Sequence, residues 1–233
     1  MNDLVQVKQN IEDINNKISE AAKNSGRKKE EITIVAVTKT FPVQAWNISI
    51  QAGLFAIAEN RIKETEVKYN STIKRAGMEL HLIGHLQSNK VRKAIKMFDI
   101  IQTVDSIRLA NKINTIAKEN NKIQNIYIQV NSGKDPKKTG FCIEKIFENI
   151  KTISLLENLK IKGIMTIPPN LKSKEKLRNI YKKTKIIRDE VYSNIDTSCI
   201  DLSMGMTNDY IIAIEEGATH IRIGTGIFGS RKT

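Results

Sequence analysis

Short β-branched runs alternate with longer amphipathic helical patterns along most of this sequence, and this alternation limits the possible folds more than any other feature. The candidate strands are residues 32–37, 54–58, 79–84, 99–104, 125–130, 160–165, 198–204 and 219–224. Helical spacing of apolar residues falls between them, at about 43–53, 60–76, 88–97, 106–120, 141–157, 173–193 and 207–216. Parallel neighbouring strands need a crossover long enough to hold a helix. Eight such units favour a closed (β/α)8 barrel over an open doubly wound sheet.

Residues 3–24 add an element before the first strand. Apolar residues recur there every three or four positions from Leu4 to Ala21, which predicts an amphipathic helix that Gly26 ends. No linker rich in Pro, Gly or Ser divides the chain, and its 233 residues suit one α/β barrel. We therefore expect a single α/β domain over residues 1–233, a (β/α)8 TIM-type barrel with an extra N-terminal helix.

The composition argues against several functional classes. The formal charge is +13, but Lys and Arg are spread along the chain, whereas nucleic-acid binding requires a clustered basic face. No stretch approaches the roughly 18 apolar residues of a membrane helix, and the N-terminal segment lacks the apolar core of a secretory signal. We expect a cytoplasmic protein without nucleic-acid or membrane partners.

Cysteine usage agrees with a reducing compartment. Cys142 and Cys199 lie far apart, and neither has a Cys or His beside it at the spacing of metal ligands. We expect no metal site and interpret both cysteines as buried, reduced thiols.

Two loops near the C-terminus carry the features of a phosphate site. In (β/α)8 barrels the functional site lies at the C-terminal ends of the strands, and phosphate groups often bind the loops after strands seven and eight. The loop at 222–230, RIGTGIFGS, has glycines that leave backbone N–H groups accessible. The loop at 202–209, LSMGMTND, offers the hydroxyls of Ser203 and Thr207. The sequence thus predicts phosphate binding on both strands.

Lys39 is the candidate reactive residue. It follows the apolar run of the first candidate strand, in VAVTKT, so it should emerge at the mouth of the barrel. A lysine between apolar walls has a lowered pKa, and its free amine can form a Schiff base. Facing two phosphate loops, such a lysine suggests a phosphorylated aldehyde, either pyridoxal phosphate or the sugar phosphate of an aldolase.

Other residues at strand ends fit a pocket at the same face. They include Asn60 after the second strand, His81 in the third, Met165 ending the sixth and Arg222 in the eighth. His81 could equally pack beneath the rim, and Met165 is best interpreted as an apolar wall.

Six strings carry a family resemblance: AVTKTFP (36–42), AENRIKE (58–64), LHLIGHLQSNK (80–90), QVNSGKDPKKTGF (129–141), KGIMTIPP (162–169) and DLSMGMTNDYIIAIEEGATHIRIGTGIFGSR (201–231). With these strings the chain resembles the pyridoxal phosphate homeostasis proteins, a family related to the N-terminal barrel of alanine racemase. The chain departs from the family pattern at Thr38, Ala58 and Thr207, where the residues remain small or keep a hydroxyl.

The resemblance implies a fold type III barrel that holds pyridoxal 5'-phosphate as a Schiff base on Lys39. It implies that Ser203 and the loop of Gly224 and Thr225 bind the phosphate. Asn60 and Arg222 would be among the groups lining the ring, and we add His81 and Met165 as cofactor-binding candidates.

Whether such a protein is an enzyme depends on a second acid or base. Racemisation needs a group that reprotonates the substrate from the face opposite Lys39. In the racemases that this barrel resembles, that group arrives on an extra β domain, which we do not expect here. The resemblance implies a role in pyridoxal phosphate homeostasis, by storage, buffering or delivery, without efficient catalysis.

We therefore expect a monomer that makes transient contacts with pyridoxal phosphate-dependent apoenzymes. A pyridoxal phosphate-dependent amino-acid racemase or lyase is the alternative, and a nucleic-acid-binding protein ranks third.

Overall fold

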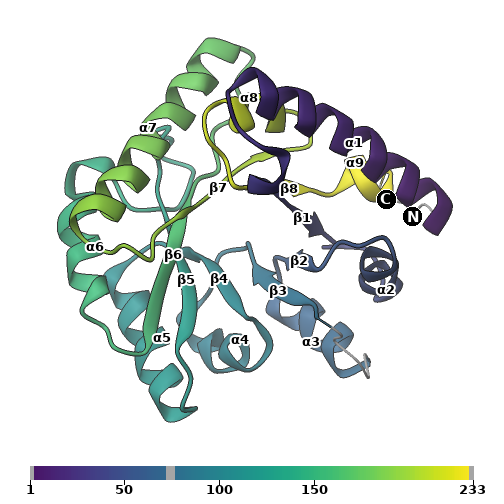
Figure 1. Ribbon diagram of the computed structural model, residues 1–233. Helices are drawn as coiled ribbons and strands as arrows, with labels where there is room; N and C mark the ends of the chain where they lie inside the picture. The colour runs from purple at the N-terminus through teal and green to yellow at the C-terminus, as the bar shows by residue number, and fades with distance from the viewer. Residues whose placement is uncertain (1–2, 72–76, 231–233) are drawn as a thin grey trace.

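The structure is a computed structural model that describes residues 3–71 and 77–230, and within these residues eight parallel strands form one closed barrel (Figure 1). The strands are β1 (Thr33–Val37), β2 (Ala56–Glu59), β3 (Glu79–Leu82), β4 (Ile100–Val104), β5 (Gln124–Gln129), β6 (Leu159–Met165), β7 (Asp201–Met206) and β8 (His220–Ile223). Each strand pairs with the next along the chain, and β1 pairs with β8 to close the barrel. Each strand overlaps a predicted run, so the predicted barrel is confirmed.

Helices surround the barrel (Figure 1). They are α1 (Leu4–Asn24), α2 (Gln44–Gln51), α3 (Ile62–Ser71), α4 (Val91–Met97), α5 (Ile107–Glu119), α6 (Ile146–Ser154), α7 (Lys174–Asn194), α8 (Tyr210–Glu215) and α9 (Thr225–Phe228). The predicted starts at 88 and 141 precede the α-helices because short 3-10 turns at Ser88–Lys90 and Ile143–Lys145 come first. The predicted end of the helix at 60–76 lies partly outside the described residues.

The N-terminal helix α1 is present as expected and packs against α8 and α9. Asp3 caps it by accepting a hydrogen bond from the Gln6 backbone N–H at 2.9 Å. Its buried face is apolar and includes Val7 and Ile18. Full burial of a Val or Ile side chain contributes about 1.5–3 kcal/mol to the stability of the fold. Asn10 Nδ2 also donates to Ile227 O at 2.8 Å. The helix therefore supports α9, which directly follows β8 at the mouth of the barrel.

The two cysteines differ in environment. Cys199 is buried as expected, and burial raises the pKa of its thiol to about 12, so the thiol stays protonated. Cys142 is exposed, which contradicts the prediction. The preceding residue, Phe141, forms an isolated bridge with Val130 and is buried. Because side chains of successive extended residues point to opposite sides, the side chain of Cys142 points outward.

Among residues 3–71 and 77–230, no helix combines the length and the hydropathy that a membrane span requires.

Candidate functional site

Lys39 leaves β1 at the C-terminal edge of the barrel, as predicted. The pairing of Ala36 with Ile223 places the segment after β1 beside the segment after β8. A Cβ at Gly224 would lie 3.2 Å from Val37 O, so a glycine there suits the close approach of the two strand ends. Lys39 is half-buried. It is therefore more exposed to solvent than the lysine between apolar walls that the sequence suggested. It therefore lies at the same edge as Gly224 and Thr225.

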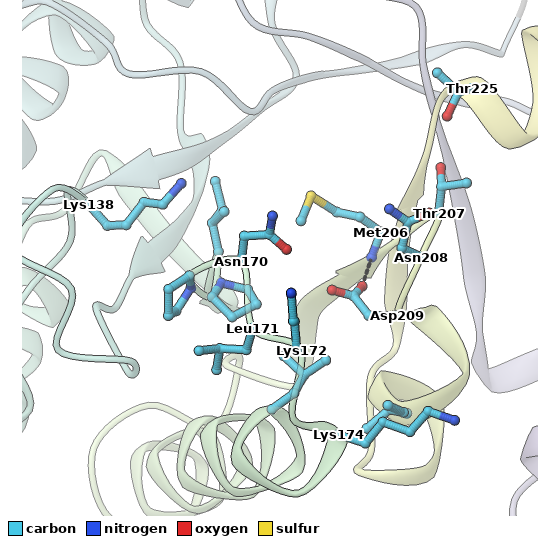
Figure 2. A pocket seen from close by; sticks show the side chains of 15 residues that line it. Lys138, Asn170, Leu171, Lys172, Lys174, Met206, Thr207, Asn208, Asp209 and Thr225 are labelled. Atoms are coloured by element: carbon cyan, nitrogen blue, oxygen red, sulfur yellow. Dashed lines mark hydrogen bonds between the residues drawn. The ribbon is translucent and has the colours of Figure 1, made fainter. Parts of the chain in front are cut away.

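A cavity of about 620 Å³ opens between the ends of β6, β7 and β8 (Figure 2). Its lining is mixed polar and apolar and includes Lys138, Pro168, Pro169, Asn170, Lys172, Met206, Thr207, Asn208, Asp209 and Thr225. Figure 2 shows Thr207 and Thr225 next to each other on the neighbouring loops after β7 and β8. The volume falls within the range of about 300–1,000 Å³ typical of small-molecule sites.

A bulge in β7 determines which hydroxyl reaches this cavity. The β7–β8 register shifts between Ser203 and Met206, and Gly205 has a φ of +88°. A Cβ at Gly205 would lie 2.6 Å from the Ala213 Cβ, so a larger residue would not fit. The bulge displaces the end of the strand, and Thr207 lines the cavity.

Ser203 belongs instead to a hydrogen-bonded chain inside the barrel. Arg222 Nη1 donates to Ser203 Oγ at 2.8 Å, and Ser203 Oγ donates to Gln102 Oε1 at 2.7 Å. Gln102 Nε2 lies 2.7 Å from His81 Nδ1, and His81 Nε2 lies 2.7 Å from Glu79 Oε1. A guanidinium can only donate, so Ser203 accepts from Arg222 and its own proton goes to the Gln102 carbonyl oxygen. The Gln102 amide nitrogen then donates to His81. His81 therefore accepts at Nδ1 and carries its proton on Nε2.

The hydrogen-bonded chain uses the hydroxyl of Ser203. Its side chain is fully buried, and its hydroxyl both accepts from Arg222 and donates to Gln102. Ser203, like Lys39, Asn60 and Arg222, is not among the residues that line this cavity, and its contact with phosphate stays a prediction.

His81 and Met165 are also fully buried in the barrel interior. The hydrogen bonds of His81 fit the packing interpretation considered for it, and its hydrogen bond holds the pKa of Glu79 below the usual range. Met165 packs with Ile100 and Tyr127 as an apolar wall.

Arg222 and Asn60 retain features of ligand-binding residues. Arg222 is 3% exposed, and desolvation lowers its pKa. Its Nη2 also donates to Thr166 O at 2.9 Å, and a guanidinium has five N–H donors, so donor capacity remains. Asn60 Oδ1 is buried and has no hydrogen-bond partner among the described residues. Such an unsatisfied buried atom is rare in folded proteins and marks a place where a ligand group could bind.

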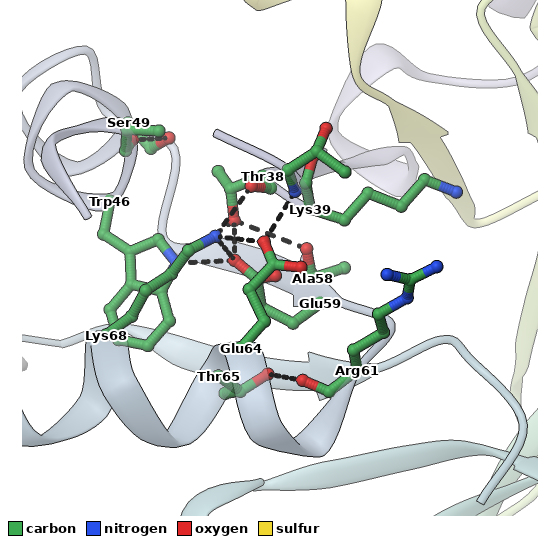
Figure 3. Close-up of polar contacts among 12 residues, drawn as sticks. Thr38, Lys39, Trp46, Ser49, Ala58, Glu59, Arg61, Glu64, Thr65 and Lys68 are labelled. Atoms are coloured by element: carbon green, nitrogen blue, oxygen red, sulfur yellow. Dashed lines mark hydrogen bonds and ion pairs between the residues drawn. The ribbon is translucent and has the colours of Figure 1, made fainter. Parts of the chain in front are cut away.

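A buried ion pair that was not predicted from the sequence lies behind Lys39 (Figure 3). Glu59 ends β2 and is fully buried, and its Oε1 accepts from Lys68 Nζ at 2.6 Å, Thr38 Oγ1 at 2.7 Å and Trp46 Nε1 at 3.0 Å. A carboxylate in an otherwise apolar strand run was the available signal. The pair lies outside the barrel wall, whereas the Lys39 side chain extends away from it (Figure 3).

Most of the cavity lining was not predicted residue by residue, although the loop at 202–209 was named. Met206, Asn208 and Asp209 follow the bulge of β7, and Asp209 Oδ1 accepts from the Met206 backbone N–H at 2.5 Å (Figure 2). The loop after β6 contributes the adjacent Pro168 and Pro169. That proline pair was the signal that could have identified a rigid loop at the mouth.

Together these features define a parallel α/β barrel with a lysine at the end of β1 and hydroxyl-bearing loops after β7 and β8. The family model described as the N-terminal domain of alanine racemase matches residues 3–232. The pyridoxal phosphate homeostasis protein of Aquifex aeolicus is 37% identical over 216 residues, covering 93% of this chain and 94% of the relative. The chain belongs to the family of pyridoxal phosphate homeostasis proteins.

Solved structures agree with this membership. PipY of Synechococcus elongatus PCC7942, determined with pyridoxal phosphate bound, aligns with a TM-score of 0.80 at 30% identity, covering 91% of this chain and all of that one. An alanine racemase of Clostridium difficile 630 aligns with a TM-score of 0.78, covering 98% of this chain and 57% of that one. Its identity is only 18%, so this second likeness concerns the fold alone.

Proposed function

We propose that this protein binds pyridoxal 5'-phosphate on Lys39 and serves intracellular pyridoxal phosphate homeostasis by storing, buffering or delivering the cofactor. The observation that carries the proposal is the shared edge of the barrel, where Lys39 leaves β1 beside the loop of Gly224 and Thr225 on β8. The names of its relatives and the bound ligand of PipY support the same conclusion.

The residues present fit the chemistry of this cofactor. Thr207 and Thr225 offer hydroxyls to a phosphate, and the first backbone N–H groups of a helical turn such as α9 lack partners within the turn. Asn60 Oδ1 is an unsatisfied buried atom, and Arg222 has donors beyond those already used. When bound, pyridoxal phosphate supplies an aldehyde that condenses reversibly with an amine, and Lys39 provides that amine.

The arrangement favours holding the cofactor over catalytic turnover. Tyr127, a possible acid or base, has its hydroxyl 3.0 Å from Asp201, which begins β7 at the far end of the barrel from Lys39. Burial raises the pKa of the Tyr127 hydroxyl well above its ordinary value, so the hydroxyl remains protonated. An arginine such as Arg222 beside the ring nitrogen would disfavour ring protonation and weaken the ring as an electron sink. Transient contact with apoenzymes in the cytoplasm, by a monomer, completes the proposal.

A mixing experiment tests this function. The loaded protein is incubated with an excess of a pyridoxal phosphate-dependent apoenzyme, and recovery of that enzyme's activity is followed. We expect transfer of the cofactor, together with amino-acid turnover orders of magnitude below the roughly 10 per second of a median enzyme. Efficient racemisation or elimination that requires Lys39 would show instead that the protein is an enzyme.

Replacing Thr207 with alanine is expected to weaken cofactor binding about tenfold or more. A hydrogen bond to a charged group contributes about 1.5–3 kcal/mol, and the hydroxyl of Thr207 lines the cavity next to Thr225. Absorbance titration of the ligand-free protein measures the dissociation constant. The control Thr207→Ser keeps the hydroxyl and should bind like the wild type, and equal affinities of the alanine and serine variants would remove Thr207 from the phosphate site.

A further inference from the structure

Thr40, the residue directly after Lys39, has an unusual backbone conformation. Its φ is +67°, in the left-handed region that β-branched residues rarely adopt. Such strain costs about 1–3 kcal/mol and persists only where the surroundings enforce it. The side chain of Thr40 is exposed and its hydroxyl bonds locally to Lys39 O at 2.5 Å, so packing of the side chain does not enforce it.

The Phe41 backbone N–H donates to Thr38 O at 3.1 Å and closes a turn around Lys39 and Thr40. Helix α3 supplies side-chain contacts to the same turn. Glu64 Oε1 accepts a hydrogen bond from the Thr40 backbone N–H at 2.6 Å (Figure 3). On the other side of Lys39, the carbonyl of Thr38 accepts from Lys68 Nζ at 2.9 Å. The peptide groups on both sides of Lys39 are therefore held by two side chains of one helix.

Glu64 is itself held in place. It lies one helical turn before Lys68, and its Oε1 is 3.0 Å from Lys68 Nζ. Lys68 is nearly buried and is fixed in turn by the fully buried Glu59. The Glu64 side chain is about one quarter exposed, so it can be replaced without leaving a cavity in the core.

We propose that Glu64 is a positioning residue for Lys39: its carboxylate stabilises the left-handed conformation of Thr40 and thereby fixes the direction in which the Lys39 side chain leaves β1. This inference rests on the proposed function, because its purpose is to present the Lys39 amine to a phosphorylated aldehyde. Glu64 acts through the backbone and need not touch the ligand.

The test combines Glu64→Ala with Thr40→Gly. Glycine adopts positive φ without strain, so it should supply the conformation that Glu64 otherwise enforces. We expect Glu64→Ala to lower the rate of covalent loading by pyridoxal phosphate about tenfold, as followed by the visible absorbance of the adduct. Adding Thr40→Gly should restore the rate to within about threefold of the Thr40→Gly single variant. Glu64→Gln keeps an acceptor oxygen and should load within about threefold of the wild type.

A role of Glu64 in general stability gives a different pattern. Thr40→Gly would then fail to restore loading in the double variant, and that result overturns the proposal. A loading rate of folded Glu64→Ala equal to that of the wild type overturns it too. A second measurement uses the wild type without ligand, in which the Thr40 amide should be protected from hydrogen exchange although the residue is exposed. Free exchange of that amide overturns the proposal as well. If the wild type takes up no cofactor, the proposed function fails, while the exchange of the Thr40 amide still decides whether Glu64 holds the backbone.

Discussion

Replacing Lys68 with methionine is expected to lower the free energy of unfolding by about 3–5 kcal/mol. The substitution removes the ammonium that lies 2.6 Å from Glu59 and leaves a carboxylate with no exposed surface unpaired. Breaking a buried pair by removing one partner is costly because the remaining charge loses both water and its counter-charge. Chemical denaturation followed by circular dichroism measures the change.

Two controls separate buried charge from loss of the side chain. The double variant Lys68→Met with Glu59→Gln removes both charges and keeps an acceptor for Thr38 and Trp46, so it should recover much of the loss. Lys93→Met breaks a pair of similar length, 2.7 Å against 2.6 Å, with Glu66 of α3, but both partners are partly exposed. That change should cost less than about 1 kcal/mol. Equal effects of Lys68→Met and Lys93→Met would contradict our account of the buried pair.

Replacing Lys39 with alanine is expected to abolish covalent attachment of pyridoxal phosphate. The protein should stay folded, because Lys39 is half-buried and its side chain extends away from the buried pair behind it (Figure 3). Residual non-covalent binding through the loops after β7 and β8 should be at least about 100-fold weaker than in the wild type. Absorbance titration measures both quantities.

Lys172→Ala is the matched control for this variant. Lys172 lines the cavity, on the loop after β6, whereas Lys39 is not among the lining residues; Lys172 does not follow the end of a barrel strand directly. It should retain the covalent adduct. An adduct that survives Lys39→Ala and disappears in Lys172→Ala would assign the reactive amine to Lys172.

The barrel could be predicted from the sequence because its signals are local and repeated. Each strand is a short β-branched run, and each crossover has helical spacing, so eight independent patterns agree on one topology. Helix ends were less predictable. Ser106 caps α5 by accepting from the Leu109 backbone N–H at 3.3 Å, whereas α8 begins only after Asp209, two residues beyond Thr207.

The site was only partly predictable for a similar reason. The position of Lys39 follows from the order of strands, which periodicity gives. That Thr207 lines the cavity and Ser203 does not depends on the bulge at Gly205, which shifts the register by an amount that no periodic pattern contains.

Contacts between distant segments left no sequence signal. The bond from Ser203 to Gln102 joins residues 101 positions apart, and the bond from the Thr40 N–H to Glu64 depends on how α3 packs against the end of β1. These contacts are set by tertiary packing, so neither the interior chain nor the support behind Lys39 could be read from local patterns.

The most direct test of the account is the identity of the modified residue. The wild-type protein is loaded with pyridoxal phosphate, reduced with borohydride, digested, and analysed by mass spectrometry. We predict one stoichiometric adduct on the peptide that contains Lys39. An adduct on another lysine, or no adduct under conditions that saturate binding, would contradict the account.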